Sequence, residues 1–390
     1  MTNRFLAYCA ILIALLLTSC DNNEAPDVTQ INEKTVFLFM PWSSTGERPY
    51  SKDLYSYFVE NIGNIEKAIT QQGGMPNYRL VTFISLSPQY AALVETTYDK
   101  GKCQRDTLKR YHSYDYTTPA GIAGLLGDVR HYAEAGTYAM VIGCHGKGWI
   151  PKDVNSFYST RAFGGVDSRM QIEIPDLAQG IAQAAMPMQY IAFDDCYMAG
   201  IEVAYDLRHA AQYLIASTSE IMAEGLSYQK IWPYMAATKP DYWHIVDGFH
   251  DYYIRQTYPY GTLSVIDCSQ AEAMASFMRD VNSRYTFDSS QTGQLQKLDG
   301  MGQTIFYDMQ SYIHHLCSFD DIVRFDQLIG QLVPYHSHTD QIYTDLSNVN
   351  GGFSTVTVNT FCGITISDPT TNYAVASRKQ QTSWWAATHP

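Results

Sequence analysis

Short apolar runs alternate with amphipathic stretches along most of the chain. Short, largely apolar runs predict strands buried in a sheet, and they lie at residues 35–42, 78–86, 138–142, 190–193, 213–217 and 262–266. Apolar residues at helical spacing predict helices between them, at residues 51–72, 118–133, 174–185, 200–209, 228–237, 242–256 and 271–285. Residues 93–111 alternate as a hairpin does. This order predicts an α/β fold with a mostly parallel central sheet between helices.

The C-terminal third has a weaker pattern. Residues 304–316 and 322–333 have helical spacing, and residues 353–366 alternate as antiparallel strands do. We therefore expect residues 34–290 to form the main α/β domain, with residues 291–390 as a smaller extension packed on it.

The N-terminus has the pattern of an export signal. Arg4 precedes an apolar stretch at residues 5–17, which is too short to remain as a membrane span. The sequence Leu-Thr-Ser-Cys at 17–20 looks like a bacterial lipobox, so we expect a signal peptide at residues 1–19 and lipidation of Cys20. Residues 20–33 would form a polar tether, and the protein would be anchored to a bacterial membrane, in the periplasm or at the cell surface. The alternative is an ordinary signal peptide with an incidental cysteine.

Composition excludes some functions. Hydrophobic residues make up 46% of the chain and charged residues 17%, which is enough for a sizeable core. A formal net charge of -13 without a basic stripe argues against nucleic acid as a partner. The eight cysteines include no zinc-type spacing, the pairs His314–His315 and His336–His338 lack ligand neighbours, and no EF-hand-like loop is present. We therefore expect no metal or other cofactor.

Reactive side chains follow two of the predicted strands. Asp194, Asp195 and Cys196 follow the run at 190–193, and His145 follows the run at 138–142. A right-handed crossover through the helix at 174–185 would make these strands parallel, with both carboxyl ends at the edge where α/β sheets bind ligands. A helix starting after Cys196 would favour its thiolate, although a free cysteine is more often an inert core residue.

These two motifs resemble a known family. The segments HGKGW at 145–149 and DDC at 194–196 are similar to the signatures of clostripain-type cysteine peptidases, which belong to the caspase-like group. The resemblance covers residues 35–269 and implies a caspase-like α/β/α sandwich. It implies that Cys196 is the nucleophile, that His145 protonates the leaving amine, and that Asp194 forms the floor of a pocket for Lys or Arg.

Further site residues are expected around this pair. The backbone amides of Gly146 and Cys196 lie at strand-to-turn junctions and are the natural oxyanion donors. Glu224 lies in a loop where related enzymes place a second pocket wall, so it would join Asp194 in charging the pocket, or else lie on the surface. Besides forming the pocket floor, Asp194 has two competing roles, which are to orient His145 or to cap the next helix. Asp195 is a second candidate for each of these two roles.

The long segment at residues 147–173 has little periodicity. A connection of this length is usually functional or disordered. Clostripain-like enzymes are commonly made as precursors that cut themselves in this region, and the bond between Arg161 and Ala162 is the best-placed site. The alternative is an ordinary surface loop.

The sequence thus predicts a lipid-anchored cysteine endopeptidase that cleaves proteins or peptides after Arg or Lys. We expect a monomer, in two chains after processing, that meets the membrane only through its lipid. Some relatives require calcium, and the sequence leaves this requirement open. Two rival hypotheses are a catalytically silent surface lipoprotein that binds peptide or glycan, and a peptidase of the same group that prefers Asn or Asp.

Overall fold

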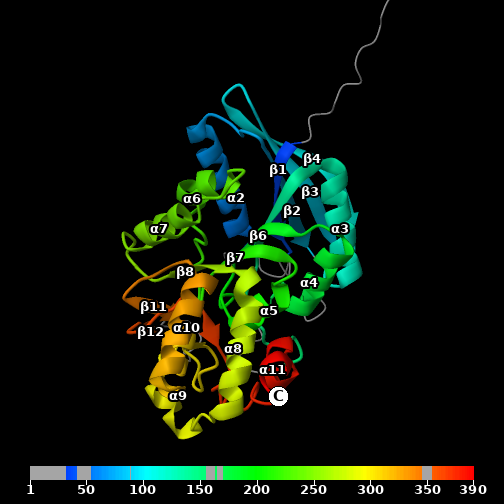
Figure 1. The fold of residues 1–390 in the computed structure, drawn as a ribbon. Coiled ribbons are helices and arrows are strands. Elements are labelled where there is room, and N and C mark those ends of the chain that lie inside the picture. Colours follow the sequence, from blue (N-terminus) through cyan, green and yellow to red (C-terminus); the bar gives the residue numbers. More distant parts are fainter. Residues whose placement is uncertain (1–31, 42–53, 88, 155–162, 165–169, 345–353) are drawn as a thin grey trace, which may run out of the picture. The chain divides into compact units, whose positions relative to one another are not determined.

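A nine-stranded sheet forms the centre of the described part of the chain (Figure 1). This computed structural model describes residues 32–41, 54–87, 89–154, 163–164, 170–344 and 354–390. The strand order is β10-β8-β7-β6-β5-β1-β2-β3-β4. The bounds in chain order are β1 Asn32–Met40, β2 Tyr78–Ser87, β3 Tyr90–Asp99, β4 Lys102–His112, β5 Ala135–Gly143, β6 Met188–Asp194, β7 Ala211–Ala216, β8 Thr262–Asp267 and β10 Tyr335–His338.

The five central strands are parallel, and the outer strands are antiparallel. Strands β7, β6, β5, β1 and β2 pair in parallel, whereas β8, β10, β3 and β4 pair antiparallel to their neighbours. The prediction of a mixed α/β fold with a mostly parallel central sheet is confirmed. Burial fits this order of parallel and antiparallel strands. The last seven residues of the central parallel strand β1 are buried, while most of the antiparallel edge strand β4 is exposed or half-buried.

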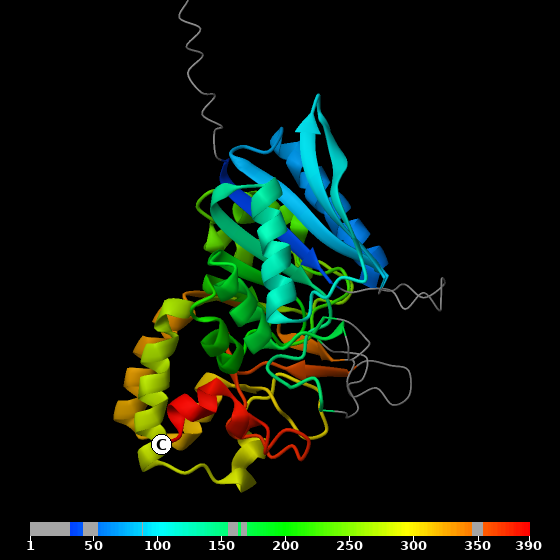
Figure 2. The ribbon, with the colours of Figure 1, turned by 90° about the vertical axis from the view of Figure 1, so that its right-hand side faces the viewer.

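Helices cover both faces of the sheet. One group contains α2 Leu54–Gln72, α6 Tyr228–Ala236 and α7 Tyr242–Tyr253, and the other contains α3 Pro119–Tyr132, α4 Ile174–Gln183 and α5 Ile201–Leu207. Figure 2 shows α3 in front of the strands and α2 behind them. The start of α3 follows its sequence, because the Thr118 hydroxyl accepts a hydrogen bond from Gly121 N–H at 3.2 Å and Pro119 occupies the first turn.

A buried lysine holds α6 against the sheet. Lys34, at the start of β1, donates to the carbonyls of Met235 at 2.8 Å and Ala237 at 2.9 Å, where α6 ends. Burial lowers the pKa of Lys34 to about 7. Cations are favoured at the C-terminal end of a helix, so this contact fixes the position of α6, whose other end reaches the strand-end residues described below.

The C-terminal elements extend the main sheet and build a smaller layer. They are α8 Ala271–Arg284, β9 Tyr307–Asp308, α9 Met309–Leu316, α10 Phe319–Leu332, β11 Gln341–Thr344, β12 Ser354–Thr357, β13 Thr365–Ile366 and α11 Ser383–Thr388. Residues Asn32–Pro390 form one compact unit, and β10 from the C-terminal third pairs with β8. No helix in the described ranges is long and apolar enough to span a membrane.

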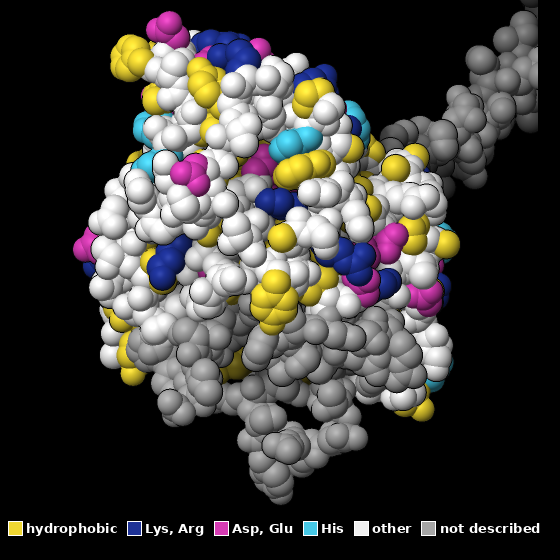
Figure 3. Space-filling view, turned by 90° about the horizontal axis from the view of Figure 1, so that it is seen from below, with side chains coloured by type: hydrophobic (Ala, Val, Ile, Leu, Met, Phe, Trp, Pro, Cys, Tyr) yellow, Lys and Arg dark blue, Asp and Glu magenta, His cyan; other side chains and the backbone are white. Residues whose placement is uncertain are grey.

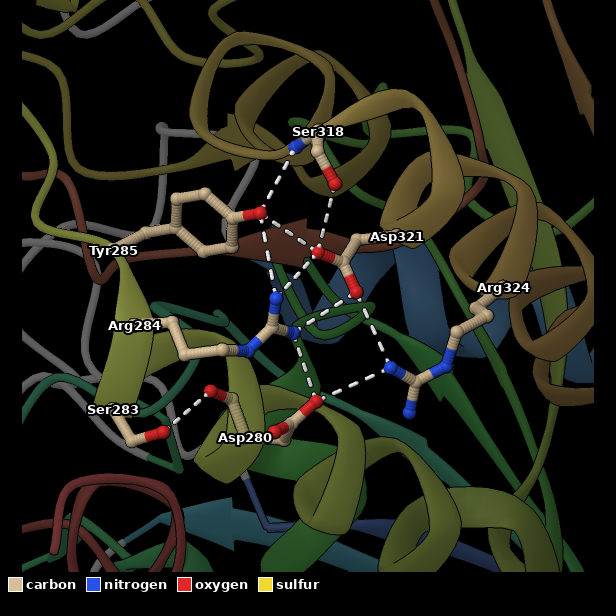
Figure 4. A network of polar contacts seen from close by, with 7 residues as sticks. All are labelled: Asp280, Ser283, Arg284, Tyr285, Ser318, Asp321 and Arg324. Carbon is tan, nitrogen blue, oxygen red and sulfur yellow. Dashed lines mark hydrogen bonds and ion pairs between the residues drawn. The ribbon is translucent and has the colours of Figure 1, made fainter.

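An ion-pair network joins α8 to α10 (Figure 4). Arg284 contacts both carboxylate oxygens of Asp321, at 2.7 and 2.9 Å, and the Tyr285 hydroxyl donates to the same carboxylate at 2.8 Å. The Arg284 guanidinium holds the pKa of Asp321 well below its usual range.

On the face seen from below, charged side chains of both signs are scattered in small groups (Figure 3).

The C-terminal third differs from the expectations in one helix boundary and one additional strand. The helix predicted at 304–316 begins only at Met309, because Tyr307–Asp308 forms strand β9 and Asp308 caps α9 by accepting from Ser311 N–H at 2.9 Å. Strand β10 was absent from the predicted pattern. The alternating stretch at 353–366 contains antiparallel strands as predicted, and β12 pairs with β11 while β13 pairs with β9.

Candidate active site

Cys196 lies just beyond the carboxyl end of β6 and is 8% exposed. Its sulfur accepts a hydrogen bond from Ile221 N–H at 3.4 Å and contacts the Ile221 carbonyl at 3.9 Å. Ile221 belongs to the loop after β7, the next parallel strand. The thiol therefore lies between two strand ends, at the edge of the sheet where α/β proteins place their ligands.

The segment that carries His145 lies directly beside Cys196. Strands β5 and β6 are parallel neighbours with Gly143 opposite Asp194, so both motifs leave the sheet at the same edge. A Cβ atom on Gly146 would lie 2.2 Å from the Cys196 carbonyl oxygen and 2.8 Å from its nitrogen. Only glycine allows this approach, which brings the predicted pair of motifs together.

Phe163 and Gly164 lie next to the backbone of His145. Phe163 and Gly164 form isolated β-bridges with His145, and the Phe163 carbonyl accepts from Ile172 N–H at 2.8 Å. The predicted cleavage site, Arg161 and Ala162, lies outside the described residues, as does the predicted lipidation site, Cys20.

Cys144 is a packed core residue. Its sulfur accepts from Gly164 N–H at 3.3 Å, and its own N–H donates to Asp195 Oδ1 at 2.6 Å. Burial and the nearby Asp195 carboxylate raise the pKa of the Cys144 thiol well above its usual value, which disfavours the nucleophilic thiolate. Cys196 is therefore the better placed of the two thiols.

Asp194 and Asp195 point to different surroundings. Asp194 accepts from Leu226 N–H at 2.8 Å, Tyr228 O–H at 2.9 Å and Asn61 Nδ2 at 3.4 Å. Its side chain thus faces the α2 and α6 group of helices. The Asp195 carboxylate faces the backbone of the His145 segment, and its Oδ2 atom has no hydrogen-bond partner among the described residues.

Burial controls the protonation of Asp194. Desolvation raises its pKa to about 6, and the hydrogen bonds from Tyr228 and Leu226 oppose this rise. Gly225, with a φ of +73°, covers the carboxylate so closely that a Cβ there would lie 2.5 Å from Asp194 Oδ2. The loop after β7 therefore contacts both the Cys196 sulfur and the Asp194 carboxylate.

The loop after β7 carries two glutamates, Glu220 and Glu224. Glu224 is exposed next to Gly225, whereas Glu220 is 1% exposed. Glu220 Oε1 accepts hydrogen bonds from Tyr197 O–H and Thr344 Oγ1, both at 2.9 Å. Sequence reasoning missed the contacts of Glu220, because its partners lie 23 and 124 residues away along the chain.

The described residues contain no group of three or more His, Cys, Asp or Glu side chains that could hold a metal ion. A cavity of about 730 Å³ is lined by residues between 292 and 371, and none of them is a candidate site residue. The reactive side chains at the strand-end site are the thiol of Cys196, the imidazole of His145 and the carboxylates of Asp194 and Asp195.

Comparisons with known proteins identify the family of the chain. The model of the clostripain family of peptidases matches residues 91–360. A secreted C11 cysteine protease from Bacteroides thetaiotaomicron, iotapain, is 41% identical, with a TM-score of 0.85 over 92% of this chain and 99% of that one. A Bacteroides thetaiotaomicron clostripain in complex with the peptide inhibitor BTN-VLTK-AOMK is 44% identical, with a TM-score of 0.55 over 58% of this chain and 99% of that one.

A more distant structure shares the fold. An inactive zymogen C11 protease from Parabacteroides distasonis is 23% identical, with a TM-score of 0.78 over 92% of this chain and 98% of that one. No curated protein matches the chain. Fold, family model and structural neighbours together define a cysteine protease of mixed α/β architecture. The chain belongs to the clostripain family.

Proposed function

We propose that this protease cleaves peptide bonds after Arg or Lys, with Cys196 as nucleophile and His145 as general acid and base. The Cys196 sulfur attacks the carbonyl carbon while His145 donates a proton to the departing amine, which leaves a thioester. His145 then takes a proton from the water that hydrolyses this thioester and restores the thiol. Backbone N–H groups of Gly146 and Cys196 stabilise the oxyanion of each step. The close approach of these two backbones supports this assignment.

The observation that carries the proposed specificity is the buried carboxylate of Asp194. It lies two residues before the proposed nucleophile, with 9% of its surface exposed, under a loop that also contacts the Cys196 sulfur. A basic side chain that reaches this carboxylate would form a charge-assisted hydrogen bond in a site with little water. The lysine in the inhibitor bound to the 44%-identical clostripain is consistent with such a pocket.

Glu224 adds a second negative charge near this pocket in our proposal. It is exposed beside Gly225, the residue that covers Asp194, so a long guanidinium or ammonium side chain would pass it on entry. We expect the exposed Glu224 to attract basic substrates as they enter. We expect the buried Asp194 to hold them more strongly, because solvent and salt screen a buried charge less than an exposed one.

The same proposal includes maturation of the chain. Residues 1–19 would direct export and then be removed, with Cys20 lipidated as the membrane anchor, and the protease would cut its own chain between Arg161 and Ala162. The description of iotapain as a secreted protease is consistent with export. The Phe163 and Gly164 contacts with His145 support self-cleavage, since they hold the residues just after the scissile bond near the proposed dyad.

Substrate kinetics test this proposal. Wild-type protein should hydrolyse fluorogenic peptides with Arg or Lys before the scissile bond, and Cys196→Ala should abolish turnover. The matched variant Cys144→Ala should keep most of the activity, because this buried thiol has a raised pKa and its sulfur accepts a hydrogen bond from Gly164 N–H. Loss of activity in Cys144→Ala with retention in Cys196→Ala would reverse the assignment.

A further inference from the structure

We propose that four residues brace the proposed nucleophile and thereby set the rate of thiol attack. This nucleophile brace consists of Tyr197, Glu220, Phe306 and Thr344. Its members are positioning residues that act through Cys196, so the inference rests on the proposed function of that cysteine. Phe306 and Thr344 come from the C-terminal third, which the proposed chemistry otherwise does not use.

Tyr197 follows Cys196 directly and has an unusual backbone conformation. Its φ of 63° lies in the left-handed region, where an aromatic residue is strained. The Tyr197 N–H donates to the Ser219 carbonyl at 2.9 Å, in the loop after β7. Such a turn persists only where its surroundings hold it, and relaxation of the turn would move the neighbouring sulfur.

The Tyr197 ring is held by stacking. Its centroid lies 4.9 Å from that of Phe306, with 14° between the ring planes. Gly148 of the HGKGW segment packs on the same two residues, and a Cβ there would lie 2.9 Å from Phe306 Cε1 and 2.9 Å from the Tyr197 carbonyl oxygen. One aromatic pair therefore contacts both the turn after Cys196 and the loop after His145.

The Tyr197 hydroxyl is held by a buried carboxylate. Glu220 Oε1 accepts from Tyr197 O–H and from Thr344 Oγ1, each at 2.9 Å, and all three side chains are buried. Ile221, the residue after Glu220, contacts the Cys196 sulfur. Hydrogen bonds to a carboxylate in this setting are strong, so Glu220 links the turn after Cys196 to the loop against its sulfur.

The C-terminal third anchors the brace. Thr344 ends β11 and packs on Gly300, where a Cβ would lie 2.1 Å from Thr344 Oγ1. Asp299, beside Gly300, accepts from the N–H groups of Ile305 and Phe306, each at 2.8 Å. The same short region thus fixes both C-terminal members of the brace, and we infer that this region serves the chemistry of the strand-end site.

Inactivation kinetics test the brace. An irreversible peptide electrophile that ends in lysine reports the rate of thiol attack as kinact and the affinity as KI. Tyr197→Phe and Thr344→Val each remove one hydrogen bond to Glu220 and should lower kinact about tenfold, with KI changed by less than about twofold. In the double variant kinact should fall by less than the product of the two single-variant factors, because both hydroxyls bind the same Glu220 oxygen.

A matched tyrosine separates positioning from stability. Tyr111 of β4 is 4% exposed and donates to Asp128 of α3 at 2.8 Å. Tyr111→Phe should therefore lower the melting temperature about as much as Tyr197→Phe does, without changing kinact. Unchanged kinact in Tyr197→Phe and Thr344→Val, with only the loss in melting temperature seen for Tyr111→Phe, would overturn the brace. Full turnover by Cys196→Ala would instead overturn the proposed function itself.

Discussion

At the scale of single residues, the protonation of Asp194 should control substrate choice. Burial raises its pKa to about 6, so the carboxylate is charged above pH 6 and becomes neutral below it. A neutral carboxyl attracts a cationic side chain weakly. We therefore expect kcat/KM for an arginine peptide, divided by kcat/KM for the citrulline analogue, to fall as the pH drops from 7 to 5.

The citrulline analogue is the internal control, because it has nearly the same shape without the charge and shares every titration of the dyad. In Asp194→Asn this ratio should fall at least about tenfold at pH 7 and should no longer depend on pH. A ratio that keeps its size and its pH dependence in Asp194→Asn would place the specificity pocket elsewhere.

At the scale of elements, buried carboxylates should make the packing around α5 sensitive to pH. Glu202 in α5 is 2% exposed, and its Oε1 accepts from Ser367 N–H at 2.7 Å. Its Oε2 has no hydrogen-bond partner among the described residues. Burial, together with the nearby Asp368, raises the pKa of Glu202 to about 8. A carboxyl whose pKa is raised by folding stabilises the fold at low pH, and this contribution is lost as the pH rises through the pKa of the folded state.

The free energy of unfolding should therefore decrease between pH 5 and pH 8, and Glu202→Gln should remove on the order of 2 kcal/mol of that decrease. Glu272→Gln is the matched control, because Glu272 pairs with Arg208 on the surface with its side chain 56% exposed. Denaturant unfolding at both pH values measures the difference. Equal pH slopes in wild type and Glu202→Gln would show that Glu202 ionises normally in the folded protein.

Elements with strong local patterns could be predicted from the sequence. Each of the five parallel strands contains a largely apolar run, and α3 begins at a Thr-Pro pair, so local chemistry indicates both. Strand β10 has the sequence YHSH, with two exposed and two half-buried residues, and forms only because β8 offers an edge. Its pairing is tertiary and leaves no periodic pattern in the sequence.

At the scale of the whole molecule, the topology explains why the site could be predicted in outline. Parallel neighbours β5 and β6 bring His145 and Cys196 to one sheet edge from two short motifs. The contacts of Glu220 with Tyr197 and Thr344 could not be predicted, since they depend on how the C-terminal third folds back. Lipidation at Cys20 and cleavage after Arg161 concern residues outside the described ranges, so they stay predictions.

The most direct test of the central claim is to map the adduct of a lysine-terminated peptide electrophile by mass spectrometry of the intact protein and its digest. Our account predicts one adduct per molecule, on Cys196, that an excess of arginine peptide slows and that Asp194→Asn strongly weakens. An adduct on Cys144, or equal labelling of Cys196 by an electrophile that ends in an acidic residue, would contradict it.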